Sequence, residues 1–162
     1  MQNSTSKVRV LTGTAMLGAV AAVLMYLEFP IPIMPAFVKL DVSELPALIA
    51  SFAYGPVSGI LVCLIKNLIK LPSTSTAAVG ELFNFVMGSV FSFSAGYIYS
   101  RNKSRKGALI GAVVGAALMA VLSVPFNYLL VYPAYVVCYG LPLDAIIGMY
   151  QAILPSSDSL IK

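Results

Sequence analysis

A small set of polar side chains interrupts the apolar segments of this sequence. Glu81 and Asn84 lie in one segment, Asn127 lies in another, and the neighbours Lys66 and Asn67 lie in a third. An amide or a carboxylate among apolar residues needs a hydrogen-bond partner, because burying such a group without one costs free energy. Glu81, Asn84 and Asn127 therefore indicate a polar site between apolar elements, whereas the roles of Lys66 and Asn67 stay open.

The residue types argue against catalysis and against a metal site. The chain has no histidine and only two cysteines, Cys63 and Cys138, which we interpret as small packing residues. No nucleophile and base stand at a spacing that would form a catalytic pair, so we predict a binding protein and not an enzyme. The alternative from a different class is a small membrane enzyme acting on lipid head groups, with Glu81 or Asp41 as its base.

The composition predicts that membrane helices position these residues. Of 162 residues, 59% are hydrophobic and 10% are charged, whereas about 25% are charged in an ordinary soluble domain. Such a chain cannot cover a water-soluble globule with polar surface, so we expect an all-α integral membrane bundle surrounded by lipid. The net charge of +4 lies mainly beside apolar segments, which is typical of membrane orientation and not of nucleic-acid binding.

Five apolar helices are predicted within a single transmembrane domain, residues 1–162. Their approximate ranges are 10–29, 43–54, 56–71, 77–100 and 107–137. The first is interpreted as a retained helix and not a signal peptide, because it is long and lacks a clean cleavage site. The second and third are short, so they form either a tilted pair or a partly re-entrant hairpin. No sixth apolar segment follows, and we interpret this as an expected sixth helix that is missing.

Basic residues predict the orientation of the bundle. Lys7 and Arg9 precede the first helix, and four positive charges lie between Arg101 and Lys106. The positive-inside rule assigns both segments to the cytoplasm, so we expect a multi-pass cell-membrane protein with a cytoplasmic N-terminus. At about 1.5 Å per residue, Asn84 lies about 26 Å from the basic segment, near the external face, and Asn127 lies at similar depth. We predict an external site there for a neutral, partly aromatic ligand, covered by the proline-rich loop 30–35.

Several of these residues keep two interpretations. Asn127 is either a ligand contact or a structural hydrogen bond between helices, and nearby Pro125 is expected to break the regular helix. Lys66 is either functional or extends outward to the membrane surface. Small residues recur every four positions from Gly80 to Gly96 and from Gly107 to Gly115, and we expect them to let helices approach closely.

Much of the chain resembles the riboflavin-specific substrate-binding components (S-components) of energy-coupling factor (ECF) transporters. The similar segments are Phe29–Pro46, Phe52–Gly59, Leu64–Leu68 and Val124–Tyr128, together with Asn84. The resemblance implies a six-helix, S-component-like fold in which the loop after the first helix closes over riboflavin near the outer face. It implies riboflavin contacts at Leu40, Asp41 and Asn127, and further contacts at Asn84 and Glu81.

The resemblance also implies partners. Ala15 and Ala19 match an Ala-x-x-x-Ala pattern through which family members dock onto a transmembrane coupling (T) component, and two separate ATPase subunits supply the energy. Riboflavin is then a transported ligand, and neither a cofactor nor a metal is expected. The family's sixth helix begins with flavin-contacting Asn and Lys residues, and this sequence ends before them. An S-component for another vitamin is the alternative within the family.

Overall fold

The predicted all-α bundle is confirmed within the residues that the computed structural model describes, which are 2–27, 29–30, 39–40, 42–74, 78–131 and 133. The α-helices are α1 (Gln2–Tyr26), α2 (Glu44–Tyr54), α3 (Pro56–Lys70), α4 (Val79–Arg101) and α5 (Arg105–Phe126). Shorter elements are the strands β1 (Phe29–Pro30) and β2 (Lys39–Leu40), the 3-10 helix η1 (Leu71–Ser73) and the π-helix η2 (Asn127–Val131). The two strands pair in antiparallel fashion, with Phe29 opposite Leu40.

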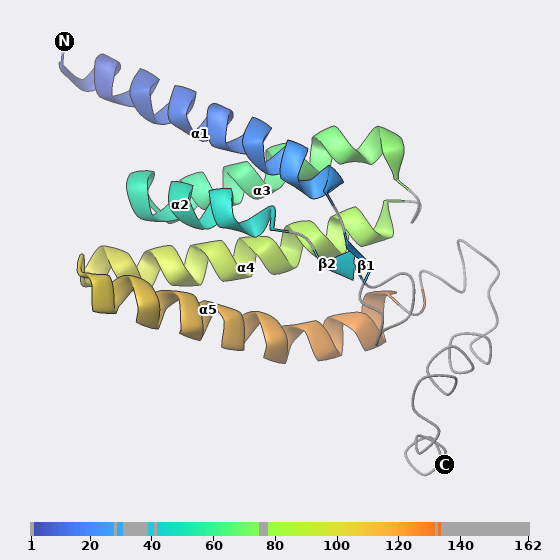
Figure 1. Cartoon of the computed structure of the whole chain (residues 1–162). Helices are drawn as coiled ribbons and strands as arrows, with labels where there is room; N and C mark the ends of the chain where they lie inside the picture. The colour runs from blue at the N-terminus through green and yellow to red at the C-terminus, as the bar shows by residue number, and fades with distance from the viewer. Residues whose placement is uncertain are drawn as a thin grey trace.

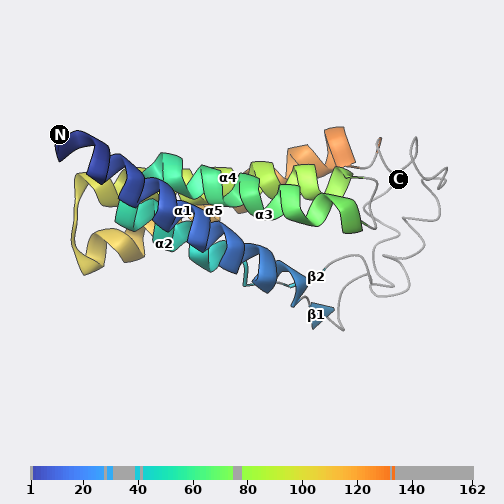
Figure 2. The ribbon, with the colours of Figure 1, turned by 90° about the horizontal axis from the view of Figure 1, so that it is seen from above.

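The helices run alongside one another, and α3 lies between several of them (Figures 1 and 2). It packs against α1, α2 and α4, and α4 in turn packs against α5. The start of α1, the α2–α3 turn at Gly55 and the α4–α5 turn at Asn102–Ser104 lie at one end of the bundle, called here the turn end. The strands β1 and β2 and the start of α4 lie at the opposite end, called the strand end.

Four described segments are long and apolar enough to cross a membrane. They are Ser6–Tyr26, Pro56–Ser73, Val79–Arg101 and Arg105–Leu129. The helix α2 has 11 residues and rises only about 16 Å, which is too short to cross alone. Large apolar side chains such as Leu11, Leu109 and Val124 are exposed on the outside of the bundle, as a lipid-facing surface requires.

Helix α1 differs from its predicted range at both ends. It begins at Gln2 and not at residue 10, and it ends at Tyr26 and not at residue 29. The earlier end follows from Pro30, because a proline favours extended backbone in the residue before it. Phe29 is accordingly in β1.

The ends of the later helices also differ from the prediction. The regular α-helix ends at Phe126, one residue after Pro125, as predicted, but the chain stays helical and widens into η2. A π-helix is one of the ways in which a helix accommodates the hydrogen bond that a proline cannot donate. Residue 77 of the predicted fourth helix and residues 132 and 134–137 of the predicted fifth lie outside the described residues.

The two rows of small residues allow α4 to approach neighbours on two sides. A Cβ atom added at Gly111 of α5 would lie 2.7 Å from the Ala95 carbonyl oxygen of α4. A Cβ atom added at Gly88 of α4 would lie 2.6 Å from Glu44 Oε1 of α2. The row on α5 therefore faces α4, whereas the row on α4 faces the α2–α3 hairpin.

Small apolar residues form the core between α1, α2 and α3. The buried cluster consists of Ala21, Ala47, Ala50, Val62 and Cys63. Gly55 reverses the chain between α2 and α3 with a φ of 108°, a backbone region that favours glycine. The resulting antiparallel hairpin brings the start of α2 beside the end of α3.

Candidate functional site

A fully buried lysine links α3 to the start of α2. The Lys66 ammonium donates to Glu44 Oε1 at 2.5 Å and to Ser43 Oγ at 2.7 Å, and the Lys66 side chain is 0% exposed. Outward extension of Lys66 to the membrane surface is therefore wrong. The Ser43 hydroxyl, which precedes α2, accepts from Lys66 and makes no capping bond to that helix.

The same polar cluster continues toward α4. Cys63 Sγ lies 3.7 Å from Glu44 Oε2 and 3.8 Å from Ser92 Oγ, and the Ser51 hydroxyl donates to the Ser92 carbonyl at 2.5 Å. We call Ser43, Glu44, Cys63, Lys66 and Ser92 the Lys66 network. Because its members lie at the start of α2, on α3 and on α4, the network fixes α2 and α4 relative to α3.

One turn beyond Cys63 on α3, Asn67 forms an amide pair with Asn84 of α4. Asn67 Nδ2 donates to the Cys63 carbonyl at 2.8 Å and lies 3.4 Å from Asn84 Oδ1, the second acceptor. Asn67 is 5% exposed, and its Oδ1 atom has no hydrogen-bond partner among the described residues. A buried acceptor without a partner is costly, so this oxygen is suited to a donor from a bound ligand.

Glu81 lies one turn before Asn84 on α4 and stabilises the turn that leads into that helix. Its side chain is buried, and its Oε2 atom accepts from Thr74 Oγ1 at 2.6 Å. Thr74 Oγ1 in turn accepts from the Ala78 backbone N–H at 3.3 Å. Ala78 has a φ of 68°, a left-handed conformation that these bonds help to hold.

Two further predicted site residues, Leu40 and Asn127, lie at or near the strand end. Asn127 is partly buried, and among the described residues its Nδ2 atom donates to the Ser123 carbonyl of its own helix at 3.0 Å. It begins η2, which packs against α4. Leu40 is in β2, and Asp41 lies outside the described residues.

The structure thus brings Glu81, Asn84 and the η2 segment toward one end of the bundle. The sequence prediction missed the pairing of Asn67 with Asn84 and of Glu44 with Lys66. One signal could have found the second pair: residues 44 and 66 are equally distant from Gly55, so an antiparallel hairpin with its turn there sets them opposite each other. Chemically, amides offer both donors and acceptors, which suits a neutral heteroaromatic ligand.

Ala15 and Ala19 lie on a different surface. Both are exposed on α1, whereas Thr14, Gly18 and Ala22 of the same helix are buried. The Ala15–Ala19 face therefore contacts no other described helix closely and presents small side chains to the surroundings.

Comparisons with known proteins agree on one family. The sequence profile of the family described as "ECF transporter, substrate-specific component" matches residues 9–158. Riboflavin transporter FmnP of Bacillus subtilis (strain 168) is 38% identical over 132 residues, which cover 80% of this chain and 70% of that protein. Riboflavin transporter RibU of Staphylococcus aureus (strain TCH60) is 35% identical over 127 residues, which cover 78% and 67%.

A solved structure supports the same likeness in three dimensions. The S component of a bacterial ECF transporter superposes on this chain with a TM-score of 0.74 and 33% sequence identity. The superposition covers 94% of this chain and 84% of that chain.

Proposed function

This chain belongs to the family of ECF transporter substrate-specific components, and we propose that it is the subunit that binds riboflavin for uptake across the membrane. Its chemistry is reversible binding and not catalysis, in line with relatives that are named as transporters. Riboflavin is the transported ligand in this proposal, and the protein needs no cofactor for its part.

The observation that carries the proposal is the amide pair near the strand end. Riboflavin combines a flat ring system bearing carbonyl groups and one imide N–H with a chain of hydroxyl groups. The Asn67 Oδ1 atom, which has no hydrogen-bond partner in the part of the chain that the structure describes, can accept from the imide or from a hydroxyl, and the Asn84 amide can donate to a ring carbonyl. We propose Leu40, Asp41, Glu81, Asn84 and Asn127 as further members of the riboflavin site.

We extend the proposal to orientation and assembly. The turn end carries Lys7, Arg9 and the basic α4–α5 turn, so it faces the cytoplasm under the positive-inside rule, and the strand end faces outward. Ala15 and Ala19 form the docking face for the transmembrane coupling component, because small side chains allow close helix approach. Two separate ATPase subunits, which assemble with that component, supply the transport energy.

Titration with riboflavin, followed by quenching of flavin fluorescence, tests the binding proposal. We expect Asn84→Leu to weaken binding about 5- to 150-fold, because losing one hydrogen bond in a desolvated site costs about 1–3 kcal/mol. Asn102→Leu, in the α4–α5 turn at the opposite end, is the matched control and should leave the affinity unchanged. Absence of quenching at micromolar riboflavin would refute the proposal, and stronger binding of another vitamin in competition would reassign the substrate.

A further inference from the structure

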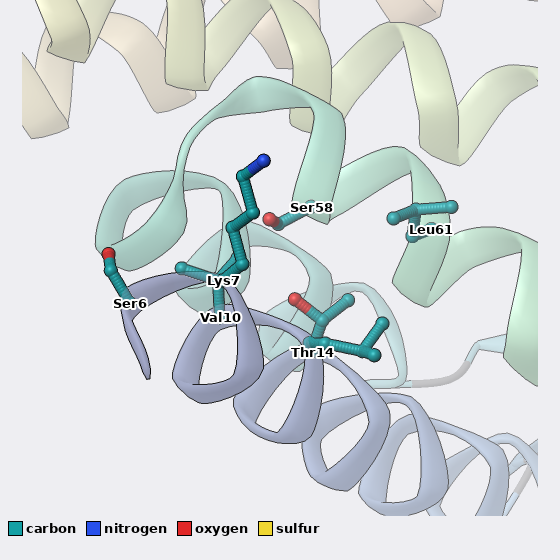
Figure 3. Close-up of a pocket in the computed structure, with 7 residues that line it drawn as sticks. Ser6, Lys7, Val10, Thr14, Ser58 and Leu61 are labelled. Carbon is teal, nitrogen blue, oxygen red and sulfur yellow. The ribbon is translucent and has the colours of Figure 1, made fainter. Parts of the chain in front are cut away.

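A second region with unused polar groups lies at the turn end, far along the bundle from the amide pair. A cavity of about 270 Å³ opens between α1 and α3 and is lined by Ser6, Lys7, Val10, Leu11, Thr14, Ser58 and Leu61. None of these seven residues is acidic. We call this the Thr14 cavity, and Figure 3 shows the side chains around it.

The Thr14 hydroxyl is the feature that needs explanation. Thr14 is 2% exposed, and its Oγ1 atom has no hydrogen-bond partner among the described residues. The hydroxyl of a threonine in a helix usually donates a hydrogen bond to the backbone carbonyl three or four residues earlier. Here the hydroxyl points toward the space that the Lys7 amino group and the Ser58 hydroxyl also face (Figure 3).

The order of groups along the cavity matches the order of groups in a phospholipid. Lys7 lies two turns nearer the end of α1 than Thr14, about 10 Å at about 1.5 Å per residue. At that end a lysine ammonium attracts an acidic head group, whereas the Thr14 hydroxyl lies deeper, where an ester carbonyl can accept a hydrogen bond. Val10, Leu11 and Leu61 provide apolar walls, and Leu11 is 67% exposed and available to an acyl chain.

We propose that the Thr14 cavity binds one acidic phospholipid. Its phosphate pairs with the Lys7 ammonium, an ester carbonyl accepts from the Thr14 hydroxyl, and an acyl chain lies on Leu11 and Leu61. A soluble anion would use the ammonium but not the apolar walls, which is why the lipid is the preferred occupant. This site is separate from the riboflavin site and does not depend on the proposed transport function.

The chain offers a matched control for each of the two polar contacts. Thr14→Val removes the buried hydroxyl with little change of shape, and Thr12→Val makes the same change at an exposed position of α1. Lys7→Gln removes the cavity's positive charge, and Arg9→Gln removes an exposed positive charge that does not line the cavity. Circular dichroism confirms that each variant retains its helices.

Native mass spectrometry of the purified full-length protein measures the lipid bound in detergent. The probes are dioleoylphosphatidylglycerol, which is acidic, dioleoylphosphatidylcholine, which is zwitterionic, and glycerol phosphate, which lacks acyl chains. We expect one phosphatidylglycerol to bind about 10-fold more tightly than phosphatidylcholine. Thr14→Val and Lys7→Gln should each weaken phosphatidylglycerol binding about 10-fold, whereas Thr12→Val and Arg9→Gln should not.

Three outcomes would overturn the proposal. Equal effects of Thr14→Val and Thr12→Val would show that the buried hydroxyl does not contact lipid. Equal binding of phosphatidylglycerol and phosphatidylcholine would show that the Lys7 charge does not select an acidic head group. Displacement of phosphatidylglycerol by an equimolar amount of glycerol phosphate would identify a site for a soluble anion.

Discussion

Replacement of Lys66 by methionine is expected to lower the free energy of unfolding by about 3 kcal/mol. Methionine keeps a flexible apolar stem and removes the ammonium, so the change deletes the charge and most of its hydrogen bonding. The Lys66 side chain is fully buried, and its loss leaves the Glu44 carboxylate with the Cys63 thiol 3.7 Å away. Breaking a buried ion pair from one side costs about 3–5 kcal/mol, and the 22% exposure of the Glu44 side chain favours the lower end of that range.

A double-mutant cycle separates the pair from its surroundings. Glu44→Gln alone should also destabilise the protein, because the ammonium then stays buried beside a neutral amide. The double variant Lys66→Met with Glu44→Gln should be more stable than the sum of the two single changes by at least about 1.5 kcal/mol, since neither unpaired charge remains. A purely steric role for Lys66 would instead give additive effects.

Unfolding by sodium dodecyl sulfate in dodecyl maltoside micelles, followed by far-UV circular dichroism, supplies the free energies. Lys103→Met is the matched control, because Lys103 is exposed in the α4–α5 turn and its loss should change stability by less than about 0.5 kcal/mol. A Lys66→Met variant as stable as that control would refute the inference that the Lys66 network holds the α2–α3 hairpin together.

Three further changes test other contacts. Gly88→Ala should destabilise the protein by about 1–3 kcal/mol in the same unfolding assay, because the added Cβ atom would lie 2.6 Å from Glu44 Oε1 and displace the carboxylate. Gly111→Leu should lower stability by about 1–3 kcal/mol, because its Cβ atom would lie 2.7 Å from the Ala95 carbonyl oxygen and separate α5 from α4. Unchanged stability would mean that the two helices do not pack this closely. Ala15→Trp or Ala19→Trp should block co-purification with the coupling component and leave riboflavin affinity unchanged. The control Val121→Trp, on an exposed face of α5, should co-purify normally. Normal yield from both alanine variants would exclude α1 as the docking face.

The bundle itself could be predicted because apolar length and composition are local properties of the sequence. The positions of the α2–α3 turn and of the α4–α5 turn followed from Gly55-Pro56 and from the basic segment after Arg101. Effects that depend on neighbouring structure were harder to predict. Pro125 was expected to break the regular helix, but the sequence did not show that the chain would continue as a π-helix.

The sequence predicts how far along the bundle the candidate site residues lie, but not which hydrogen bonds they make. Counting residues from the basic segment put Glu81 and Asn84 near one end of the bundle, because the rise of a helix is nearly constant. Hydrogen-bond partners depend on how each helix is rotated about its axis, so the contact between Asn67 and Asn84 could not be derived. Glu81 bonds to Thr74 in the adjacent turn, and the sequence does not distinguish that structural bond from a ligand contact. The riboflavin contacts stay predictions for all five residues, Leu40, Asp41, Glu81, Asn84 and Asn127.

The short length of α2 has a consequence for how the protein enters the membrane during synthesis. A helix of 11 residues is too short to be retained as a separate span, and α3 alone would carry the Lys66 ammonium into hydrocarbon, which costs up to about 2.5–3.5 kcal/mol. Once Gly55 has reversed the chain, Glu44 lies beside Lys66 and compensates its charge. The insertion machinery should therefore integrate residues 44–70 in a single event, and the ion pair should form before α4 has left the ribosome.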